Sequence, residues 1–226
     1  MKLTLPRICG LVLASLAVYL SVSHAAHGAG SSVAVPLTTT AYAQGKDTKG
    51  VVLLAVRWDR KWRCGGFENA QLRVIGFDRL PSQKTTDEES ADVVFDDAPL
   101  IATKPTFDDY AMIMEPGEYA LSTLQIKVAR SVSDVGFFKA SRSLFLKDGK
   151  AEGGTFNVSA GEVVYIGHFY LDCYKQPTLW RYYMDGRAAF DEYLASVKSR
   201  YPMLNIAQTQ FRLFKTTVFG NDYVLK

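Results

Sequence analysis

The sequence predicts a mainly β fold, an antiparallel β-sandwich with one C-terminal amphipathic helix. Apolar residues recur at every second position or in short runs, as in strands that bury one or both faces. Residues typical of turns separate these runs, and only one stretch near the C-terminus has apolar residues at spacings of three and four. A chain of 226 residues, 48% of them hydrophobic, is long enough to bury a single core.

The N-terminus is expected to precede this fold. Two basic residues come before an apolar run at 8–22, and Ser23 and Ala25 then occupy positions −3 and −1 of a cleavage site. This layout predicts a secretory signal peptide over residues 1–25. An uncut membrane anchor is the alternative, since residues 8–26 approach the roughly 20 that cross a bilayer. We expect an exported protein in the periplasm or cell envelope of a Gram-negative bacterium.

Cleavage would change the charge balance. Removing residues 1–25 leaves 24 basic and 23 acidic residues, a net charge of +1. Such a total indicates neither nucleic-acid binding nor a polybasic membrane patch, and no membrane span is expected after cleavage. Residues 26–49, rich in small and polar side chains, predict a flexible leader. Residues 50–226 are expected to form a single domain.

Cleavage would also remove Cys9 and leave Cys64 and Cys173. An even pair in an oxidising compartment predicts one disulfide, which would close a loop of 109 residues. Two separate buried thiols are the alternative. The cysteines and histidines lack the spacing of a zinc site, and we expect no metal.

The first half of the domain predicts two strands and a third, shorter one. Residues 51–58 read as a buried strand and residues 71–80 as an alternating one, with a loop at 59–67 between them. The polar, acidic residues 81–92 indicate a mobile surface connection. Residues 93–103 predict a short strand.

The middle of the chain predicts three hairpins. Pro116-Gly117 favours a type II turn, Asp148-Gly149 a type I′ turn, and a third turn contains Gly161. The expected pairs join residues 110–114 to 119–128, residues 143–146 to those after 150, and residues 155–158 to 162–171.

The C-terminal part predicts a helix and a closing strand. Asp185 is placed to cap a helix at 186–200, which Pro202 ends. We expect this helix to cover an edge or an open end of the sandwich, because exposed strand edges invite aggregation. A helix that binds a partner protein is the alternative. The alternation over residues 209–219 predicts the last strand.

Two motifs carry a resemblance, PGEYAL at 116–121 and GGTFNVSAGEVVYIG at 153–167. They resemble a pattern in exported bacterial β-sandwich proteins of unassigned function. The resemblance implies a prealbumin-like or immunoglobulin-like sandwich. It covers about a quarter of the chain and consists of turn and core residues, so it implies no catalytic residue.

Sequence motifs for catalysis are absent. His168 is the only histidine after residue 49, and no GxSxG, GxxxxGK[ST] or GxGxxG accompanies it. Its apolar neighbours indicate a buried imidazole. We therefore expect no enzyme and no cofactor, but a non-catalytic envelope protein that binds or supports another envelope component. A hydrolase or transferase that uses His168 with loop acids is the alternative.

Aromatic residues are the remaining candidates for a binding site. Trp58 and Trp62 bracket a loop, and Trp180, Tyr182 and Tyr183 precede the helix. Exposed rings at such positions could stack on a sugar, as in a carbohydrate-binding module, whereas buried rings would belong to the core. The partner classes that remain are an envelope protein and a glycan.

Overall fold

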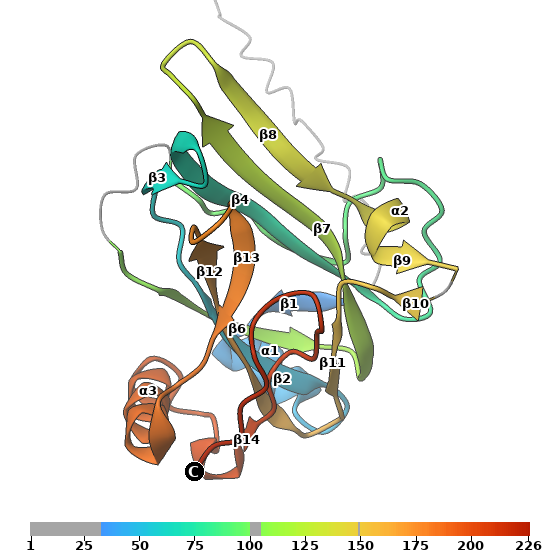
Figure 1. Ribbon diagram of the computed structural model, residues 1–226. Coiled ribbons are helices and arrows are strands. Elements are labelled where there is room, and N and C mark those ends of the chain that lie inside the picture. Colours follow the sequence, from blue (N-terminus) through green and yellow to red (C-terminus); the bar gives the residue numbers. More distant parts are fainter. Residues whose placement is uncertain (1–32, 100–104, 149) are drawn as a thin grey trace, which may run out of the picture. The chain divides into compact units, whose positions relative to one another are not determined.

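A computed structural model describes residues 33–99, 105–148 and 150–226 of the chain. Residues 32–226 form one structural unit. The signal peptide expected at 1–25 and residues 26–32 lie outside the described residues. The described unit is mainly β, and the predicted β-sandwich with a C-terminal helix is confirmed (Figure 1).

Two six-stranded sheets make up the sandwich. The first sheet has the order β1–β6–β2–β12–β13, with β14 also paired to β12; its strands are β1 (Ala34–Pro36), β6 (Asp108–Met114), β2 (Gly50–Val56), β12 (Val163–Asp172), β13 (Thr178–Tyr182) and β14 (Gln210–Phe211). The second sheet has the order β11–β7–β4–β3, with β5 on β4 and β8 on β7; its strands are β11 (Thr155–Val158), β7 (Gly117–Ala129), β4 (Phe67–Arg79), β3 (Lys61–Cys64), β5 (Val93–Phe95) and β8 (Val135–Ala140). Pairing is antiparallel except where β12 runs parallel to β2 and to β14.

The main core lies between the two sheets and is rich in aromatic rings. Phe77 of β4 is at its centre, with ring centroids 5.4 Å from Phe156, 5.8 Å from Phe214, and 6.3 Å from both Phe95 and Phe169. These edge-to-face contacts add to the free energy that burial of each ring already supplies. Strands from both sheets contribute, so neither sheet is stable without the other.

Two of the three predicted hairpins are wrong. The turn at 115–116 leads from β6, which pairs with β2, to β7, which pairs with β4. The turn at 159–162 likewise leads from β11 in the second sheet to β12 in the first. Turn residues indicate that the chain reverses direction. The next strand shows the same alternation of apolar and polar residues whether it pairs with the preceding strand or joins the facing sheet. The remaining hairpin is present between β9 (Leu146–Lys147) and β10 (Lys150–Ala151), but most of its first strand, predicted at 143–146, is helical, in α2 (Arg142–Phe145).

Three expected irregular or short segments also differ from the structure. The loop predicted at 59–67 contains β3, which forms a hairpin with β4. The leader predicted at 26–49 contains β1 and helix α1 (Thr39–Gly45), whose first turn is capped by the Thr38 hydroxyl. The last strand, predicted at 209–219, is limited to β14. Beyond it, the Phe214 backbone nitrogen donates to the Ile166 carbonyl oxygen of the first sheet, and Lys215 exchanges backbone hydrogen bonds with Thr155 of the second.

The C-terminal helix α3 (Gly186–Arg200) has the predicted bounds but a different position. Instead of an edge or an end, it covers the outer face of the first sheet, where Phe190, Leu194 and Val197 pack in a cluster with Leu53 and Tyr165. The first sheet is apolar on both faces there, so a second layer is required. Asp185 is at the capping position without a side-chain bond. The two remaining helices are α2 (Arg142–Phe145) and the 3-10 turn η1 (Ile206–Gln208).

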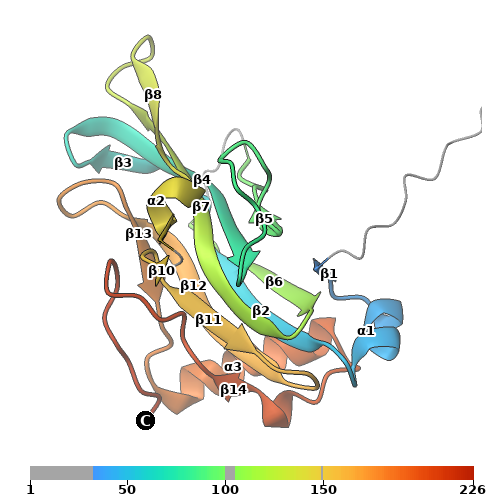
Figure 2. The ribbon, with the colours of Figure 1, turned by 90° about the vertical axis from the view of Figure 1, so that its right-hand side faces the viewer.

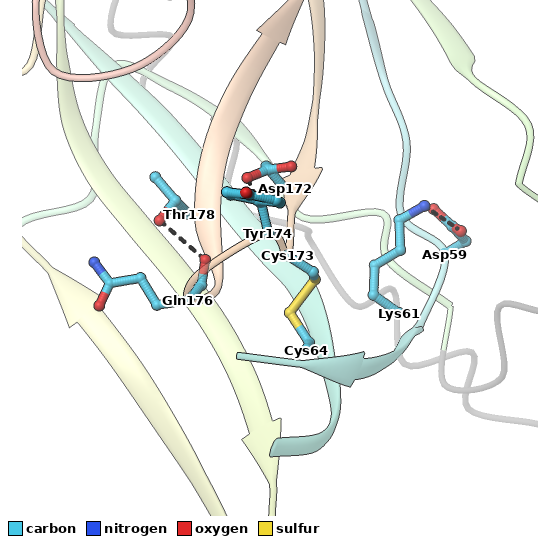
Figure 3. Close-up of a disulfide and its surroundings, with 8 residues drawn as sticks. All are labelled: Asp59, Lys61, Cys64, Asp172, Cys173, Tyr174, Gln176 and Thr178. Atoms are coloured by element: carbon cyan, nitrogen blue, oxygen red, sulfur yellow. Dashed lines mark hydrogen bonds and ion pairs between the residues drawn. A yellow bond between two sulfur atoms is a disulfide. The ribbon is translucent and has the colours of Figure 1, made fainter. Parts of the chain in front are cut away.

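The predicted disulfide between Cys64 and Cys173 is confirmed (Figure 3). Their Cα atoms are 4.7 Å apart, and the bond joins the end of β3 in the second sheet to the residue after β12 in the first. Within the described residues, no helix has both the length and the apolar character needed to cross a bilayer.

Candidate functional site

A β-bulge in β12 places His168 on the outer face of the first sheet. The register between β12 and β2 shifts between Tyr165 and Gly167, and Gly167 has a φ of +128°. One extra residue in a strand reverses the alternation beyond it. Tyr165 and His168 therefore share the outer face although they are three positions apart, while Ile166 and Phe169 both belong to the core.

The outer face beyond α3 contains an open cleft of about 470 Å³. Its lining residues come from two strands of the first sheet, β12 and β13, and from the residues next to β2 and β6: His168 and Tyr170, Tyr182, Arg57 and Phe107. Strand pairing explains why they meet, since His168 is opposite both Ala55 of β2 and Tyr182 of β13. The cleft is thus built on paired strands, which hold side chains more precisely than loops do.

His168 is a buried, neutral group in this cleft. Its side chain is 5% exposed, and its Nδ1 lies 2.7 Å from the Tyr165 hydroxyl oxygen. Burial lowers the pKa of His168 to about 4 and raises the pKa of Tyr165 well above its ordinary value. At neutral pH the Tyr165 hydroxyl therefore stays protonated and can donate a hydrogen bond to Nδ1. In that arrangement Nε2 carries the imidazole proton and remains for a ligand.

Arg57 supplies the positive charge of the cleft. Its guanidinium carbon lies 5.3 Å from the ring centroid of Phe107 and 4.9 Å from that of Tyr170. Asp59 forms ion pairs at 3.0 Å with both Arg57 and Lys61, although the Arg57 contact lacks hydrogen-bond geometry. One carboxylate thus serves two cations, and this group has a net charge of +1.

Tyr182 provides the exposed aromatic surface. Its side chain is 42% exposed, and its ring is within 24° of parallel to Phe107 and within 4° of parallel to Tyr183. Tyr183 in turn stacks on Tyr223 at a centroid distance of 4.3 Å. Near-parallel rings therefore continue from the cleft toward the C-terminus.

The structure separates the aromatic residues that the sequence indicated. Trp58 is buried in the core and donates its Nε1 proton to the Tyr110 hydroxyl at 2.9 Å. Trp62 is 62% exposed on β3, outside the cleft, and Trp180 packs partly buried against the core. Only Tyr182 lines the cleft, with Tyr183 beside it.

Sequence reasoning missed three cleft residues, Arg57, Phe107 and Tyr170. Tyr170 had a local signal, because it alternates with His168 on one strand. The other two come together with His168 only through the parallel pairing of β2 with β12 and the pairing of β2 with β6.

A second cavity, of about 560 Å³, lies where the connection at 81–92 meets α2. Its two cations already have partners: Arg142 Nε lies 2.6 Å from Asp78, and Lys84 Nζ lies 3.2 Å from Asp78 and 2.6 Å from Asp92. Arg142 also donates to the Thr86 and Glu89 carbonyl oxygens. These bonds anchor the connection predicted to be mobile, and the charges hold the fold together instead of facing a ligand.

Acidification is expected to destabilise the fold through His168. Its pKa is about 4 in the folded protein against an ordinary value of 6.5, so between these values the unfolded state binds more protons. The free energy of unfolding should therefore fall by about 2 to 3 kcal/mol as the pH drops from 7 to 4.5. Urea unfolding at both pH values would show this fall in the wild type and its absence in His168→Gln. Equal pH dependence in the two proteins would contradict a neutral, buried imidazole.

The two motifs of the resemblance contribute no residue to the lining of the cleft. PGEYAL starts β7, and the longer motif covers β11, the turn to β12 and the Gly167 bulge that positions His168. Their glycines have structural roles, such as Gly154, where an added Cβ would lie 2.4 Å from the Lys215 carbonyl oxygen. No cluster of three potential metal-ligating side chains occurs in the described part of the chain. Comparisons of this chain with protein-family models, curated proteins and solved structures give no match.

Proposed function

We propose that the chain is an exported, non-catalytic binding protein of the cell envelope, and that its ligand is a sugar of an envelope glycan held in the cleft around His168. The observation that supports this most is the composition of the cleft. Phe107, Tyr170 and Tyr182 supply aromatic surfaces, and Arg57 and His168 supply polar donors between them. Ligand sites typically combine mainly apolar walls with a few placed polar groups.

The chemistry of a sugar ring matches both kinds of surface. Its C–H face is apolar and can stack on an exposed ring such as Tyr182, while its hydroxyl groups need hydrogen-bond partners. Nε2 of His168 and the terminal guanidinium nitrogens of Arg57 can donate to those hydroxyls. The net charge of +1 around Arg57 further favours sugars that carry a carboxylate.

The same geometry gives less support to a hydrolase or transferase. A general base works best with a pKa near the operating pH, whereas burial lowers the pKa of His168 to about 4. The described cleft lining contains no carboxylate or serine. Asp109 of β6 and His168 of β12 both pair with Ala55 of β2, so one strand lies between the carboxylate and the imidazole. Two strand spacings separate their backbones, roughly 10 Å.

Export is part of the proposal and is supported by two features. The N-terminal sequence has the layout of a signal peptide. The disulfide between Cys64 and Cys173 is of a kind that persists mainly in oxidising compartments.

Tyr182→Ala is expected to weaken glycan binding about tenfold or more, which corresponds to about 1.4 kcal/mol. The reason is that it removes the most exposed ring of the cleft. Binding would be measured on a glycan array and by pull-down with peptidoglycan. Trp62→Ala is the matched control, because Trp62 is an exposed ring outside the cleft. Equal losses in both variants, or turnover of the bound glycan, would contradict the proposal.

A further inference from the structure

Three turns meet at one end of the sandwich, at the upper left of Figures 1 and 2. They join β3 to β4, β7 to β8, and β12 to β13. The disulfide links the first to the third, and an added Cβ at Gly65 would lie 2.4 Å from the Gln176 Cα. Phe67, the first residue of β4, contacts Phe138 of β8 at a centroid distance of 5.5 Å. We call residues 60–68, 127–139 and 172–178 the tip surface.

The tip surface exposes large apolar side chains. Val132 is 97% exposed, Tyr174 87% and Trp62 62%, and each belongs to a different one of the three segments. Phe137 and Phe138 of β8 are each about half exposed. Single exposed apolar residues are normal on a protein surface, but a group at the ends of adjacent hairpins marks an interaction site.

The tip surface is also the basic part of the protein. Its three segments contain seven basic and three acidic residues, a net charge of +4, and one of the seven, Lys61, forms an ion pair with Asp59 just before the first segment. Residues 26–226 together have a net charge of +1, so the remaining residues of that range carry −3. The net charge of residues 26–226 is close to zero, and for that reason a polybasic membrane patch was not predicted. This total conceals the separation between a basic tip surface and an acidic remainder. Sequence totals could not reveal it, because the three segments lie far apart along the chain.

We propose that the tip surface docks this protein on an anionic lipid surface. Trp62 and Tyr174 are of the two residue types that favour the headgroup region, where one end of the ring is apolar and the other is wet. Val132 and Phe137 can enter the acyl boundary, and the surrounding basic side chains face anionic headgroups. Charge complementarity thus identifies the occupant, and each Lys or Arg near such a surface adds about a fivefold gain in partitioning.

The covalent framework suits this role. The disulfide links the β3–β4 turn to the β12–β13 turn. The β7–β8 turn contacts the first of these through Arg130, whose guanidinium carbon lies 4.9 Å from the ring centroid of Phe67. A preformed surface loses little conformational entropy on binding. An aliphatic side chain such as Val132 at the outermost turn finds an apolar environment in a lipid layer, whereas a nucleic acid offers it no stacking partner.

Vesicle flotation tests the electrostatic part. The full chain would be mixed with phosphatidylcholine vesicles, with or without 30 mol% phosphatidylglycerol, at low and high salt. The triple variant Arg63→Gln, Arg130→Gln, Lys175→Gln is expected to partition about 100-fold less onto the anionic vesicles at low salt. The control Lys150→Gln, Lys215→Gln, Lys226→Gln also removes three exposed charges, but outside the tip surface, and should bind like the wild type.

The double variant Val132→Ser, Tyr174→Ser tests the apolar part and should weaken vesicle binding. The control is the double variant Val218→Ser, Val224→Ser, which removes exposed apolar side chains outside the tip surface and should bind like the wild type. Residues 1–25 are present in every variant, so any contribution they make to vesicle binding is common to all. Circular dichroism would verify that each variant is folded. Tip variants that bind as well as the wild type would overturn the proposal. Tip-dependent binding of a single-stranded oligonucleotide without tip-dependent vesicle binding would also overturn it, and would identify a nucleic-acid site instead.

Discussion

Cys64→Ser is expected to lower the free energy of unfolding by about 4 to 5 kcal/mol, the largest single effect in this protein. The disulfide closes a loop of 109 residues, and chain-entropy arguments give long loops the greatest stabilisation. It also joins a strand of one sheet to a strand of the other, so its loss affects the packing between them. Urea unfolding followed by tryptophan fluorescence would measure the difference.

Three controls distinguish the missing bond from the missing side chain. Cys173→Ser should give the same loss as Cys64→Ser, and the double variant should lose no more than either. A reductant should destabilise the wild type but leave the double variant unchanged. A loss below about 1 kcal/mol would show that the bond constrains the unfolded chain much less than its loop length implies.

Asp78→Asn is expected to cost about 3 to 5 kcal/mol, because it leaves a buried cation without its counter-charge. The Asp78 side chain is fully buried and accepts hydrogen bonds from Arg142 Nε at 2.6 Å, Lys84 Nζ at 3.2 Å and the Asp92 backbone nitrogen at 3.0 Å. The matched control is Asp191→Asn, which removes an exposed ion pair to Arg187 and should cost less than about 1 kcal/mol.

The pH dependence of the two proteins provides a second measurement. Burial alone would raise the pKa of Asp78, but the bonds from Arg142, Asp92 and Lys84 outweigh it and hold the pKa below its ordinary 3.8. The ionised carboxylate therefore stabilises the fold above pH 4, and this stabilisation is lost as the pH falls through the folded pKa. Asp78→Asn should lack that loss while keeping the one from His168, which occurs at higher pH. Similar acid unfolding below pH 4 in both proteins would contradict the role of Asp78.

A paired substitution separates the charge from the space it fills. Replacing Asp78 with Leu and Arg142 with Met should recover much of the stability that Asp78→Asn loses, because no unpaired charge remains buried. Failure to recover would indicate that the two carbonyl bonds of Arg142 to the 81–92 connection matter more than its charge.

Local sequence patterns predicted where strands and α3 lie better than they predicted which strands pair. A continuous apolar run located β2, alternation located β4, β7 and β12, and helical spacing gave α3 its bounds, because these patterns depend on neighbouring residues. The hairpins predicted between β6 and β7 and between β11 and β12 were wrong, because at both turns the chain crosses to the other sheet and alternation does not identify the strand's partner. The bulge at Gly167 was also missed, because a glycine in a strand has several interpretations.

The candidate site shows the same division. His168 was singled out as the only histidine after residue 49 and predicted to be buried, which is confirmed, and Tyr182 was singled out from its aromatic cluster. Arg57 and Phe107 are far from His168 along the chain, and only the register of β6, β2 and β12 brings them together. The net charge of residues 26–226 was misleading for a related reason, because it adds a basic tip surface to an acidic remainder.

The parallel pairing of β2 with β12 has a consequence for how the chain folds. It joins Val51 to Val163, so the centre of the first sheet connects residues more than 100 positions apart. Contacts of such long range make folding slow, typically milliseconds to seconds for β-sandwiches. Until β12 has been synthesised, one edge of β2 has no partner and is exposed to aggregation. The centre of the first sheet therefore cannot form until residues 163–172 have left the ribosome.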